Sequence, residues 1–420
     1  MSRRALGIWS ATALVVGNMI GSGVFLLPAS LAPYGATALI GWAITLVGTL
    51  ALAATFARLA RKWPHTGGPY AFARAGFGDA AGFLIAWSYW VSIWSAIAAI
   101  AVAFAGSIGA LFPAIAATPV HSAACALAAL WVCLGINLAG VREAGRTQVV
   151  LTVLKIIPLL LFALVAIWFV DRHNLALTHP AATSFPSAIN ATAALTLWAM
   201  LGFESATVPA GHTDNPERTI PRATVSGALL AGVVTVLACT AVTGIVAPET
   251  LAKSTAPMAD AARQLWGRGA GVAIAALMAV ACLGALNGWV LLSAQVPMAA
   301  AQDGLLPAAF ARLDANGTPR FGLMASGLLA TLLIVANYTR SLVQLFTFSI
   351  LLSTAATLLP YLAGAGAWLR RGDRRGRIVA AIGFAFAIYA LTGIGREAML
   401  WGAALLATGL PVYGWMRRQR

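Results

Sequence analysis

The sequence predicts an all-α membrane protein with about twelve transmembrane helices. Of its 420 residues, 60% are apolar and only 9% are charged, whereas soluble domains carry about 25% charged residues. Apolar segments of about 20 residues, long enough to cross a hydrocarbon core of roughly 30 Å, recur from end to end. A soluble enzyme is therefore excluded. We expect no enzymatic activity, since no nucleophile–base pair or set of metal ligands lies within the spans.

The expected spans follow these apolar segments. We place them near residues 7–33, 36–60, 80–108, 122–141, 147–170, 188–211, 223–246, 269–300, 321–336, 340–364, 377–394 and 398–416. The first follows Ser2-Arg3-Arg4 and has the look of a signal peptide. Its apolar run is longer than a signal peptide needs and eleven spans follow it, so we interpret it as an uncleaved helix.

The net charge of +15 indicates orientation in the membrane rather than nucleic-acid binding. Of the 27 lysine and arginine residues, twenty lie in segments on the side of the two termini and six on the opposite side, and Lys155 lies within a span. Cytoplasmic loops of membrane proteins carry such an excess of basic residues. We therefore expect both termini in the cytoplasm and no nucleic-acid partner.

Cysteine and histidine residues give no sign of a metal site or a disulfide framework. The four cysteines, Cys125, Cys133, Cys239 and Cys282, all lie in apolar segments, where cysteine usually acts as a small hydrophobic residue. No CxxC or HExxH spacing occurs. We expect neither a metal nor another cofactor.

Two of the spans contain breaks. Residues 17–23 place three glycines with Asn18 and Ser22 at mid-membrane depth in the first span, and residues 198–205 place Gly202 and Glu204 there in the sixth. Glycine in a helix costs about 1 kcal/mol relative to alanine. Unwound backbone at this depth is tolerated only where it is packed in protein or lines a cavity. Glycines that merely allow close helix packing are the alternative, but packing needs no polar groups.

Breaks in spans 1 and 6 suggest an inverted five-plus-five repeat with a central substrate site. We expect the first repeat at 1–171, the second at 188–364, and two additional spans at 377–416. At each break, freed N–H groups at a half-helix N-terminus attract a carboxylate, and freed carbonyl groups accept hydrogen bonds from an ammonium group. Two facing breaks could hold an α-amino acid zwitterion without any charged side chain.

Two charged residues lie in the middle of spans, Glu204 and Lys155. Ionisable groups at this depth cost several kcal/mol and are functional candidates for that reason. The alternative for Glu204 is a neutral carboxyl that serves only as a packing hydrogen bond, and for Lys155 it is extension of the side chain to an interface. A buried lysine could also bind and release a proton during a transport cycle. Trp198 and Trp289 could belong to the core or could cover a substrate side chain.

The segment Gly17–Ala29, GNMIGSGVFLLPA, resembles the first-helix motif of the amino acid/polyamine/organocation transporter superfamily. Within it, the resemblance is closest to the bacterial arginine/agmatine and putrescine/ornithine antiporter group, and it extends over most of the chain. Further matching segments are 67–71, 196–206, 215–218, 282–289 and 303–305.

The resemblance implies a LeuT-like fold and a set of functional positions. The implied substrate-binding residues are Asn18, Ile20, Gly21, Ser22, Gly23, Ser92, Ile93, Ile97, Trp198, Leu201, Gly202, Trp289 and Ser353. The implied gating residues are Tyr89, Trp198, Glu204 and Tyr361, and the implied coupling or pH-sensing residues are Lys155, Glu204 and Tyr70.

The sequence departs from the arginine antiporter at two of these positions. Ile97 stands where that group has an asparagine in the side-chain pocket, and leaving buried donors of a guanidinium group unpaired costs about 1–3 kcal/mol each. This favours neutral or aliphatic substrates. The arginine antiporter also has no lysine at the position of Lys155. In proton-dependent members of the superfamily, a lysine at this position resembles a substitute for a bound sodium ion.

We therefore expect a bacterial inner-membrane amino acid transporter that works by alternating access and is either proton-coupled or an exchanger. The first alternative is an antiporter of cationic amino acids or polyamines. A weaker alternative is a non-transporting amino acid sensor, although the short tails leave no room for a signalling domain. The expected partners are a small amino acid or amine, protons and the lipid bilayer, and the resemblance suggests a homodimer.

Overall fold

The computed structural model describes residues 7–64, 67–139, 141–208, 210, 213–315 and 317–419, with backbone alone at 141–153 and 419. The spans in chain order are α1 (Ile8–Met19) with α2 (Ser22–Leu31), α3 (Thr37–Lys62), α5 (Asp79–Leu111), α7 (Pro119–Leu138), α8 (Val141–Ala166), α9 (Phe185–Trp198) with the 3-10 helix η4 (Phe203–Thr207), α10 (Pro216–Ile245), α13 (Arg268–Gln302), α14 (Arg320–Ala336), α15 (Leu342–Arg371), α16 (Arg374–Thr392), and α17 (Arg396–Ala407) with α18 (Gly409–Gln419).

Short helices connect several of the spans. They are η1 (Ala32–Tyr34), α4 (Pro69–Phe77), α6 (Pro113–Ala116), η2 (Ile167–Phe169), η3 (Arg172–Leu175), α11 (Pro248–Leu251), α12 (Pro257–Trp266) and η6 (Ala308–Ala311).

The predicted fold class is confirmed. Nine helices within the described ranges are long and apolar enough to cross a membrane, and Leu154–Phe169 and Arg320–Ala336 are shorter apolar helices. The broken pair α9 and η4 supplies the remaining span. The spans begin and end within seven residues of the predicted positions, and the first and sixth are broken. The repeat boundaries at 1–171, 188–364 and 377–416 remain a prediction.

Local sequence signals explain several helix starts. Ser341 and Gln344 form a capping box at α15, in which each side chain bonds the backbone N–H of the other residue. Asp373 caps α16 and Thr118 caps α7 in the same way, by accepting from a backbone N–H in the first turn. These caps satisfy N–H groups that have no partner within the helix.

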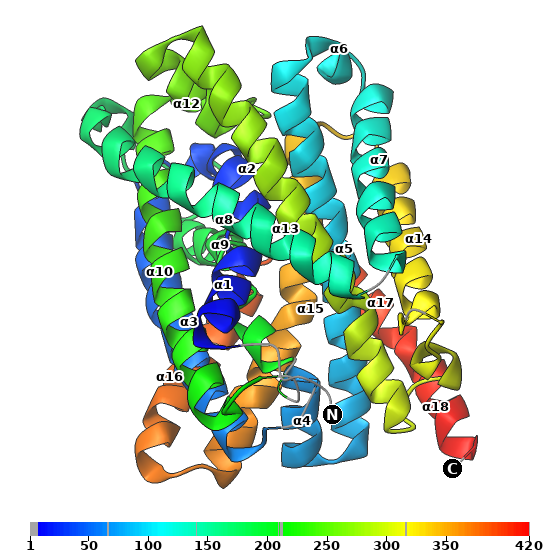
Figure 1. The fold of residues 1–420 in the computed structure, drawn as a ribbon. Helices are drawn as coiled ribbons and strands as arrows, with labels where there is room; N and C mark the ends of the chain where they lie inside the picture. The colour runs from blue at the N-terminus through cyan, green and yellow to red at the C-terminus, as the bar shows by residue number, and fades with distance from the viewer. Residues whose placement is uncertain are drawn as a thin grey trace.

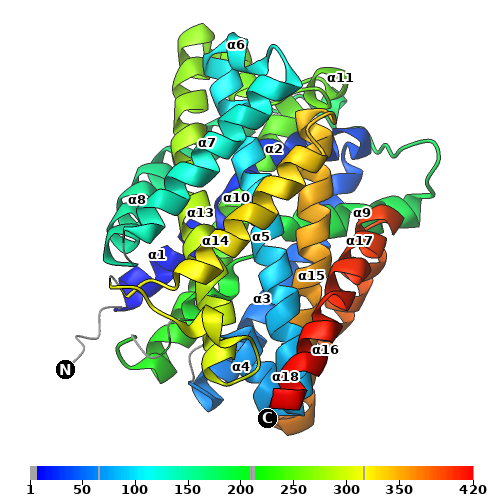
Figure 2. The ribbon, with the colours of Figure 1, turned by 90° about the vertical axis from the view of Figure 1, so that its right-hand side faces the viewer.

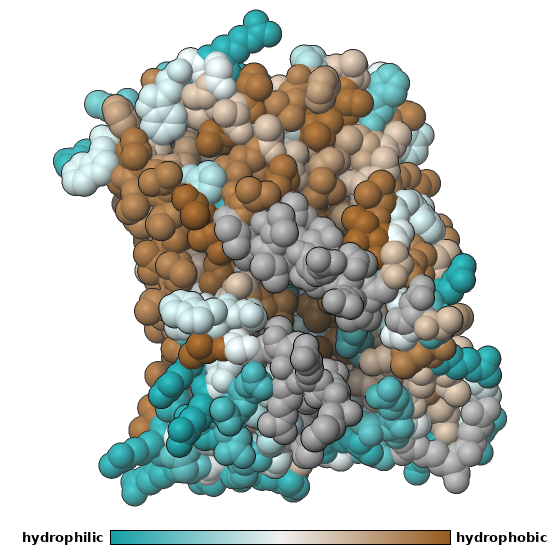
Figure 3. Space-filling model, in the orientation of Figure 1, coloured by the Kyte–Doolittle hydropathy of each residue, from teal (hydrophilic) through white to brown (hydrophobic). Residues whose placement is uncertain are grey.

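The helices stand side by side, and α1 and α9 lie at mid-height in the bundle (Figure 1). Helix α5 packs along α13 and α15, while α1 packs against α10, α8 and η4. Figure 2 shows α18 and the lower part of α16 at the same end of the molecule. On the face seen in Figure 3, hydrophobic residues cover the upper and middle parts and hydrophilic side chains gather at the lower end, as expected for a protein in a bilayer.

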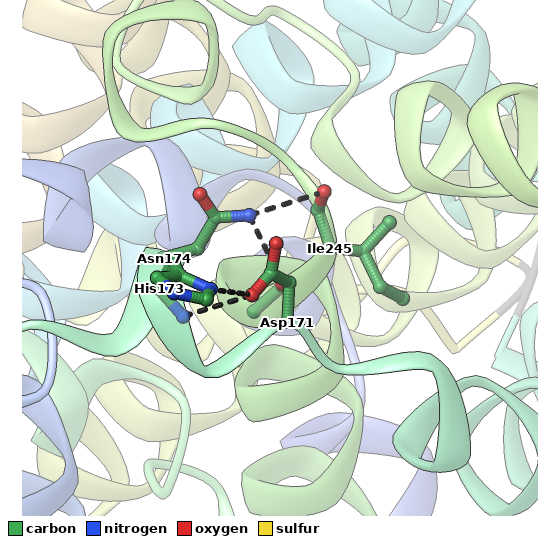
Figure 4. A network of polar contacts seen from close by, with 5 residues as sticks. Asp171, His173, Asn174 and Ile245 are labelled. Atoms are coloured by element: carbon green, nitrogen blue, oxygen red, sulfur yellow. Dashed lines mark hydrogen bonds and ion pairs between the residues drawn. The ribbon is translucent and has the colours of Figure 1, made fainter.

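The segment after α8 is attached to the end of α10 (Figure 4). Asn174 donates from its side-chain amide to the carbonyl oxygens of Gly244 and Ile245, at 3.1 and 3.4 Å. Asp171 accepts from the backbone N–H of His173 at 2.9 Å, and this bond lowers the pKa of the Asp171 carboxyl. The ends of the fifth and seventh spans are therefore joined at the end of the bundle opposite the α15–α16 turn.

Candidate functional site

The break in the first span exposes polar groups inside the protein. Helix α1 ends at Met19, Ile20 and Gly21 leave the helical conformation, and α2 begins at Ser22. Both polar atoms of the Asn18 side chain and the Ser22 hydroxyl are buried without a hydrogen-bond partner in the described structure. Gly21 offers no side-chain cap to the N-terminus of α2, so this half-helix presents its first N–H groups together with two unpartnered side chains.

The break in the sixth span begins directly after Trp198. Residues 199–201 form a turn in which the Leu201 N–H donates to the Trp198 carbonyl oxygen at 3.2 Å. Gly202 then adopts a left-handed conformation with φ of 107°, which a residue with a side chain would rarely adopt. The 3-10 helix η4 follows at Phe203.

The two breaks are in direct contact. A Cβ atom on Gly202 would lie 3.1 Å from the backbone of Asn18, and one on Gly23 would lie 2.7 Å from the Cβ of Ala199. Only glycine at these two positions lets the backbones approach this closely. The polar groups of the first break therefore face the turn of the sixth.

A small cavity of about 10 Å³ lies between the breaks. It is lined by Asn18, Met19, Gly21, Ser22, Gly23, Ile100, Trp198, Leu201 and Trp289. Such a volume holds about one water molecule. An amino acid could enter only after the walls move, so the structure is closed around this site.

Seven of the predicted substrate-binding residues line this cavity, and two lining residues, Met19 and Ile100, were not predicted. Ile100 lies three positions after Ile97 on α5, and residues at this spacing share a helix face. That periodicity was the available signal for Ile100. Met19 is the residue between Asn18 and the break.

Six predicted residues lie outside the cavity lining: Ile20, Ser92, Ile93, Ile97, Gly202 and Ser353. All six are buried. Ser353 donates to the Ser92 carbonyl oxygen at 2.8 Å and so joins α15 to α5. Ile93 and Ile97 are at most 1% exposed in the middle of α5.

Three of the four predicted gating residues, Tyr89, Glu204 and Tyr361, meet in the structure. The hydroxyl of Tyr89 donates to Oε1 of Glu204 and the hydroxyl of Tyr361 donates to Oε2, both at 2.8 Å. The N–H of Gly202 also donates to Oε2, at 3.1 Å. Glu204 is fully buried. One carboxyl group thus links α5 and α15 to the break in the sixth span.

Lys155 is also fully buried. Its ammonium group donates to the carbonyl oxygen of Gly17 at 2.5 Å, which joins α8 to the last turns of α1. The alternative in which the lysine extends to an interface does not apply to this conformation.

Tyr70 lies away from the cavity, at the lower end of the bundle. Its hydroxyl donates to Asp303 at 2.7 Å, and Arg74 pairs with both Asp303 and Asp79 at 2.8 Å. Burial and the neighbouring Asp303 raise the pKa of the Tyr70 phenol well above its ordinary value. Asp303 and Arg74 were not predicted as partners of Tyr70. Asp303 is separated from Tyr70 by 233 positions in the chain, whereas Arg74 lies about one turn after Tyr70 on α4, and that spacing was the available signal.

Within the described residues, no group of three or more His, Cys, Asp or Glu side chains is arranged to hold a metal ion. The four cysteines are free.

Comparison with known proteins assigns the family. The family model described as amino acid permease matches residues 6–412. The chain belongs to the amino acid permease family. It is therefore a multi-pass membrane transport protein.

Its relatives include named antiporters and polyamine transporters. The permease is 36% identical to the cadaverine/lysine antiporter of Escherichia coli over 80% of this chain and 75% of that protein. It is 31% identical to the putrescine transporter PotE of Escherichia coli over 97% of this chain and 95% of that protein. The corresponding figures for PotE of Haemophilus influenzae are 32%, 98% and 97%.

Proposed function

We propose that this permease carries amino acids across a bacterial inner membrane by alternating access and binds the zwitterion between the breaks of spans 1 and 6. The observation that carries the proposal is the pair of facing breaks with Asn18 and Ser22 buried and unpartnered between them. A buried polar group without a partner costs about 1–3 kcal/mol. A bound ligand that pairs with these groups removes that cost.

Each end of the zwitterion has a suitable partner. The N–H groups at the start of α2, beside Ser22 and Gly23, suit a carboxylate. Carbonyl groups at the end of α9, around Trp198 and Leu201, suit the ammonium group. Trp198 and Trp289 both line the cavity, and their movement admits the substrate and then closes the site.

The side-chain end of the site favours an uncharged substrate. Ile100 lines the cavity and Ile97 lies one turn away on the same helix. No acidic side chain lines the cavity, so an ammonium or guanidinium group on the substrate would have few acceptors there.

The second candidate is antiport of cationic amino acids or polyamines. The relatives named as carriers of cadaverine, lysine and putrescine favour it. In this case Trp289 covers the substrate chain and Ser353 contacts its charged end after the site opens.

Two residues fit roles in coupling. Glu204 connects the sixth-span break to two tyrosines, so its hydrogen bonds would link substrate occupancy to gate closure. Lys155 would serve as a fixed cation that braces α8 against α1, where other transporters of this fold use sodium. Proton symport and obligatory exchange are both compatible with this arrangement.

We further propose that both termini lie in the cytoplasm, with twenty basic residues on that side. The end of α18 and the α15–α16 turn, both rich in arginine, lie at one end of the bundle (Figures 1 and 2). A homodimer through α16, α17 and α18 completes the proposal.

Uptake into proteoliposomes tests this function. One set of vesicles is empty and the other is preloaded with unlabelled amino acids, without a pH gradient. Labelled leucine, lysine, arginine and putrescine are compared, with protein-free vesicles as the control. Uptake of none of these by either set would refute transport. Uptake only into preloaded vesicles means exchange, and preference for putrescine or lysine selects the second candidate.

A further inference from the structure

One corner of the lower end concentrates positive charge. It comprises the end of α3 and the α15–α16 turn and holds seven exposed basic residues: Arg61, Lys62, Arg370, Arg371, Arg374, Arg375 and Arg377. The turn lies at the bottom of Figure 1. The two parts touch, since the Lys62 ammonium group donates to the Arg371 carbonyl oxygen. The one carboxylate in the turn, Asp373, caps α16.

Four of these seven cations already have contacts. Arg370 and Arg371 donate to the carbonyl oxygens of Gly76 and Ala75, at 3.3 and 2.6 Å, and Arg61 donates to the Glu217 carbonyl oxygen. Lys62 also lies over the rings of Trp63 and Trp368, 5.2 and 5.7 Å from their centroids. These contacts hold the α15–α16 turn against α3 and α4.

The guanidinium groups of the remaining three, Arg374, Arg375 and Arg377, make no hydrogen bond or ion pair with any described residue. They occupy the first turn of α16. Positive charge is unfavourable there, because the N-terminus of a helix itself carries partial positive charge. A bound anion would offset both the charge of the three arginines and the partial charge of the helix N-terminus.

An apolar groove of about 540 Å³ begins farther along α16. Its walls include Ile44 and Val47 of α3 and Ile382 and Ala385 of α16. Ile382 lies five positions after Arg377, which corresponds to roughly 8 Å along the helix axis. The same two helices thus present cations at their lower ends and a groove at membrane depth.

We infer that this corner binds an anionic phospholipid of the cytoplasmic leaflet, with its phosphate on Arg374, Arg375 and Arg377 and an acyl chain in the α3–α16 groove. A headgroup phosphate matches the guanidinium fork, and basic clusters beside a membrane helix attract anionic lipids. A soluble anion would use the arginines alone, whereas a lipid uses the groove as well. The assignment to the cytoplasmic leaflet rests on the orientation proposed above, in which both termini lie in the cytoplasm.

Lipid binding is measured on the full chain in detergent, without transport, so failure of the transport proposal leaves the result readable. Phosphatidylglycerol is titrated and thermal stability is followed, with phosphatidylcholine and glycerol 3-phosphate as comparison ligands. We expect phosphatidylglycerol to raise the melting temperature by several degrees at concentrations where the other two have little effect.

The triple variant R374Q/R375Q/R377Q should need at least tenfold more phosphatidylglycerol for the same shift. The matched control R222Q/R312Q/R320Q removes three exposed arginines with the same change of charge, and it should respond as the parent does. Equal responses of the parent to both phospholipids, or equal losses in both triple variants, would overturn the inference.

Ala385→Trp fills the exposed groove and tests whether an acyl chain binds there. It also serves as the second variant if the triple arginine variant fails to fold. It should weaken phosphatidylglycerol binding while leaving the melting temperature without lipid unchanged. If it instead alters the oligomeric state and leaves lipid binding intact, the groove is a contact between copies of this chain. If glycerol 3-phosphate stabilises as well as the lipid does, the arginines hold a soluble anion, and the lipid assignment is wrong.

Discussion

The ammonium group of Lys155 donates a 2.5 Å hydrogen bond to the carbonyl oxygen of Gly17. Gly17 lies in α1, three residues before Ile20 leaves the helical conformation. A side chain on the fifth span therefore holds the half-helix whose end lines the proposed substrate cavity. Any motion that reshapes the break in span 1 must stretch or keep this bond, which makes Lys155 a direct mechanical link between two spans.

Lys155→Ala should slow transport at least tenfold and alter its pH dependence, because the variant loses the bond between α8 and α1 and a lysine that is fully buried in the middle of a span. Uptake at pH 5, 6, 7 and 8 measures both effects. Lys253→Ala removes an exposed lysine outside the spans and serves as the control. A variant that is slower with the parent's pH profile would reduce Lys155 to a structural role.

Glu204→Ala should abolish transport while the protein still folds. The change leaves the hydroxyls of Tyr89 and Tyr361 without their acceptor. Each unpaired buried hydroxyl lowers the stability of the folded protein by about 1–3 kcal/mol. The triple variant E204A/Y89F/Y361F removes the unpaired hydroxyls, so it should regain thermal stability without regaining uptake. Normal uptake by Glu204→Ala would exclude the carboxyl from the mechanism.

Gly23→Ala should impair both folding stability and transport. The added Cβ would lie 2.7 Å from Ala199 Cβ and 2.8 Å from its Cα, and overpacking of this kind costs about 1–3 kcal/mol. The control is Gly135→Ala in α7, where a Cβ meets nothing within 4 Å. Thermal melting in detergent and uptake are compared for the two variants, and equal behaviour would mean that the two breaks do not pack as described.

Ile97→Asn should improve recognition of arginine by about fivefold or more, since one new hydrogen bond to a buried guanidinium group contributes about 1 kcal/mol. Competition of arginine against a labelled substrate measures the effect. Ile97→Val changes the volume without adding a polar group and should show no gain. If arginine competes no better against Ile97→Asn, the apolar wall of α5 does not determine the substrate.

Tyr70→Phe tests the phenol at the lower end. Its pKa in the folded protein is raised by burial and by Asp303, above the value near 10 of an unfolded chain. The stabilisation that comes with this shift is therefore fully present below pH 10 and is lost only as the pH rises through the folded pKa. The ratio of parent to variant uptake should stay constant between pH 7 and pH 9.5. A break in the ratio within this range would mean that the phenol itself titrates there.

Much of this fold could be predicted because each span carries its own signal. Apolar length gave the helices, and glycines beside polar residues at membrane depth gave the breaks at Gly21 and Gly202. The meeting of Tyr89, Glu204 and Tyr361 came from the family resemblance, and the structure brings the three together; their gating role remains a proposal.

Other features depend on packing between distant segments and had no local signal. The network of Tyr70, Arg74 and Asp303 forms only when α4 meets the end of α13. The closed state of the cavity depends on how Trp198 and Trp289 pack, which no spacing along the chain determines. The groove between α3 and α16 likewise arises from two helices more than three hundred residues apart in sequence.

The most direct test of the central claim is equilibrium binding of a labelled transported amino acid, with its methyl ester, its N-acetyl form and its decarboxylated amine as competitors. If the two breaks hold both ends of the zwitterion, each of these analogues should compete at least tenfold more weakly than the parent amino acid. Exchanging one aliphatic side chain for another should have a smaller effect. If the ester and the amine compete as well as the amino acid, the carboxylate is not bound at the break of span 1, and the proposed site is wrong.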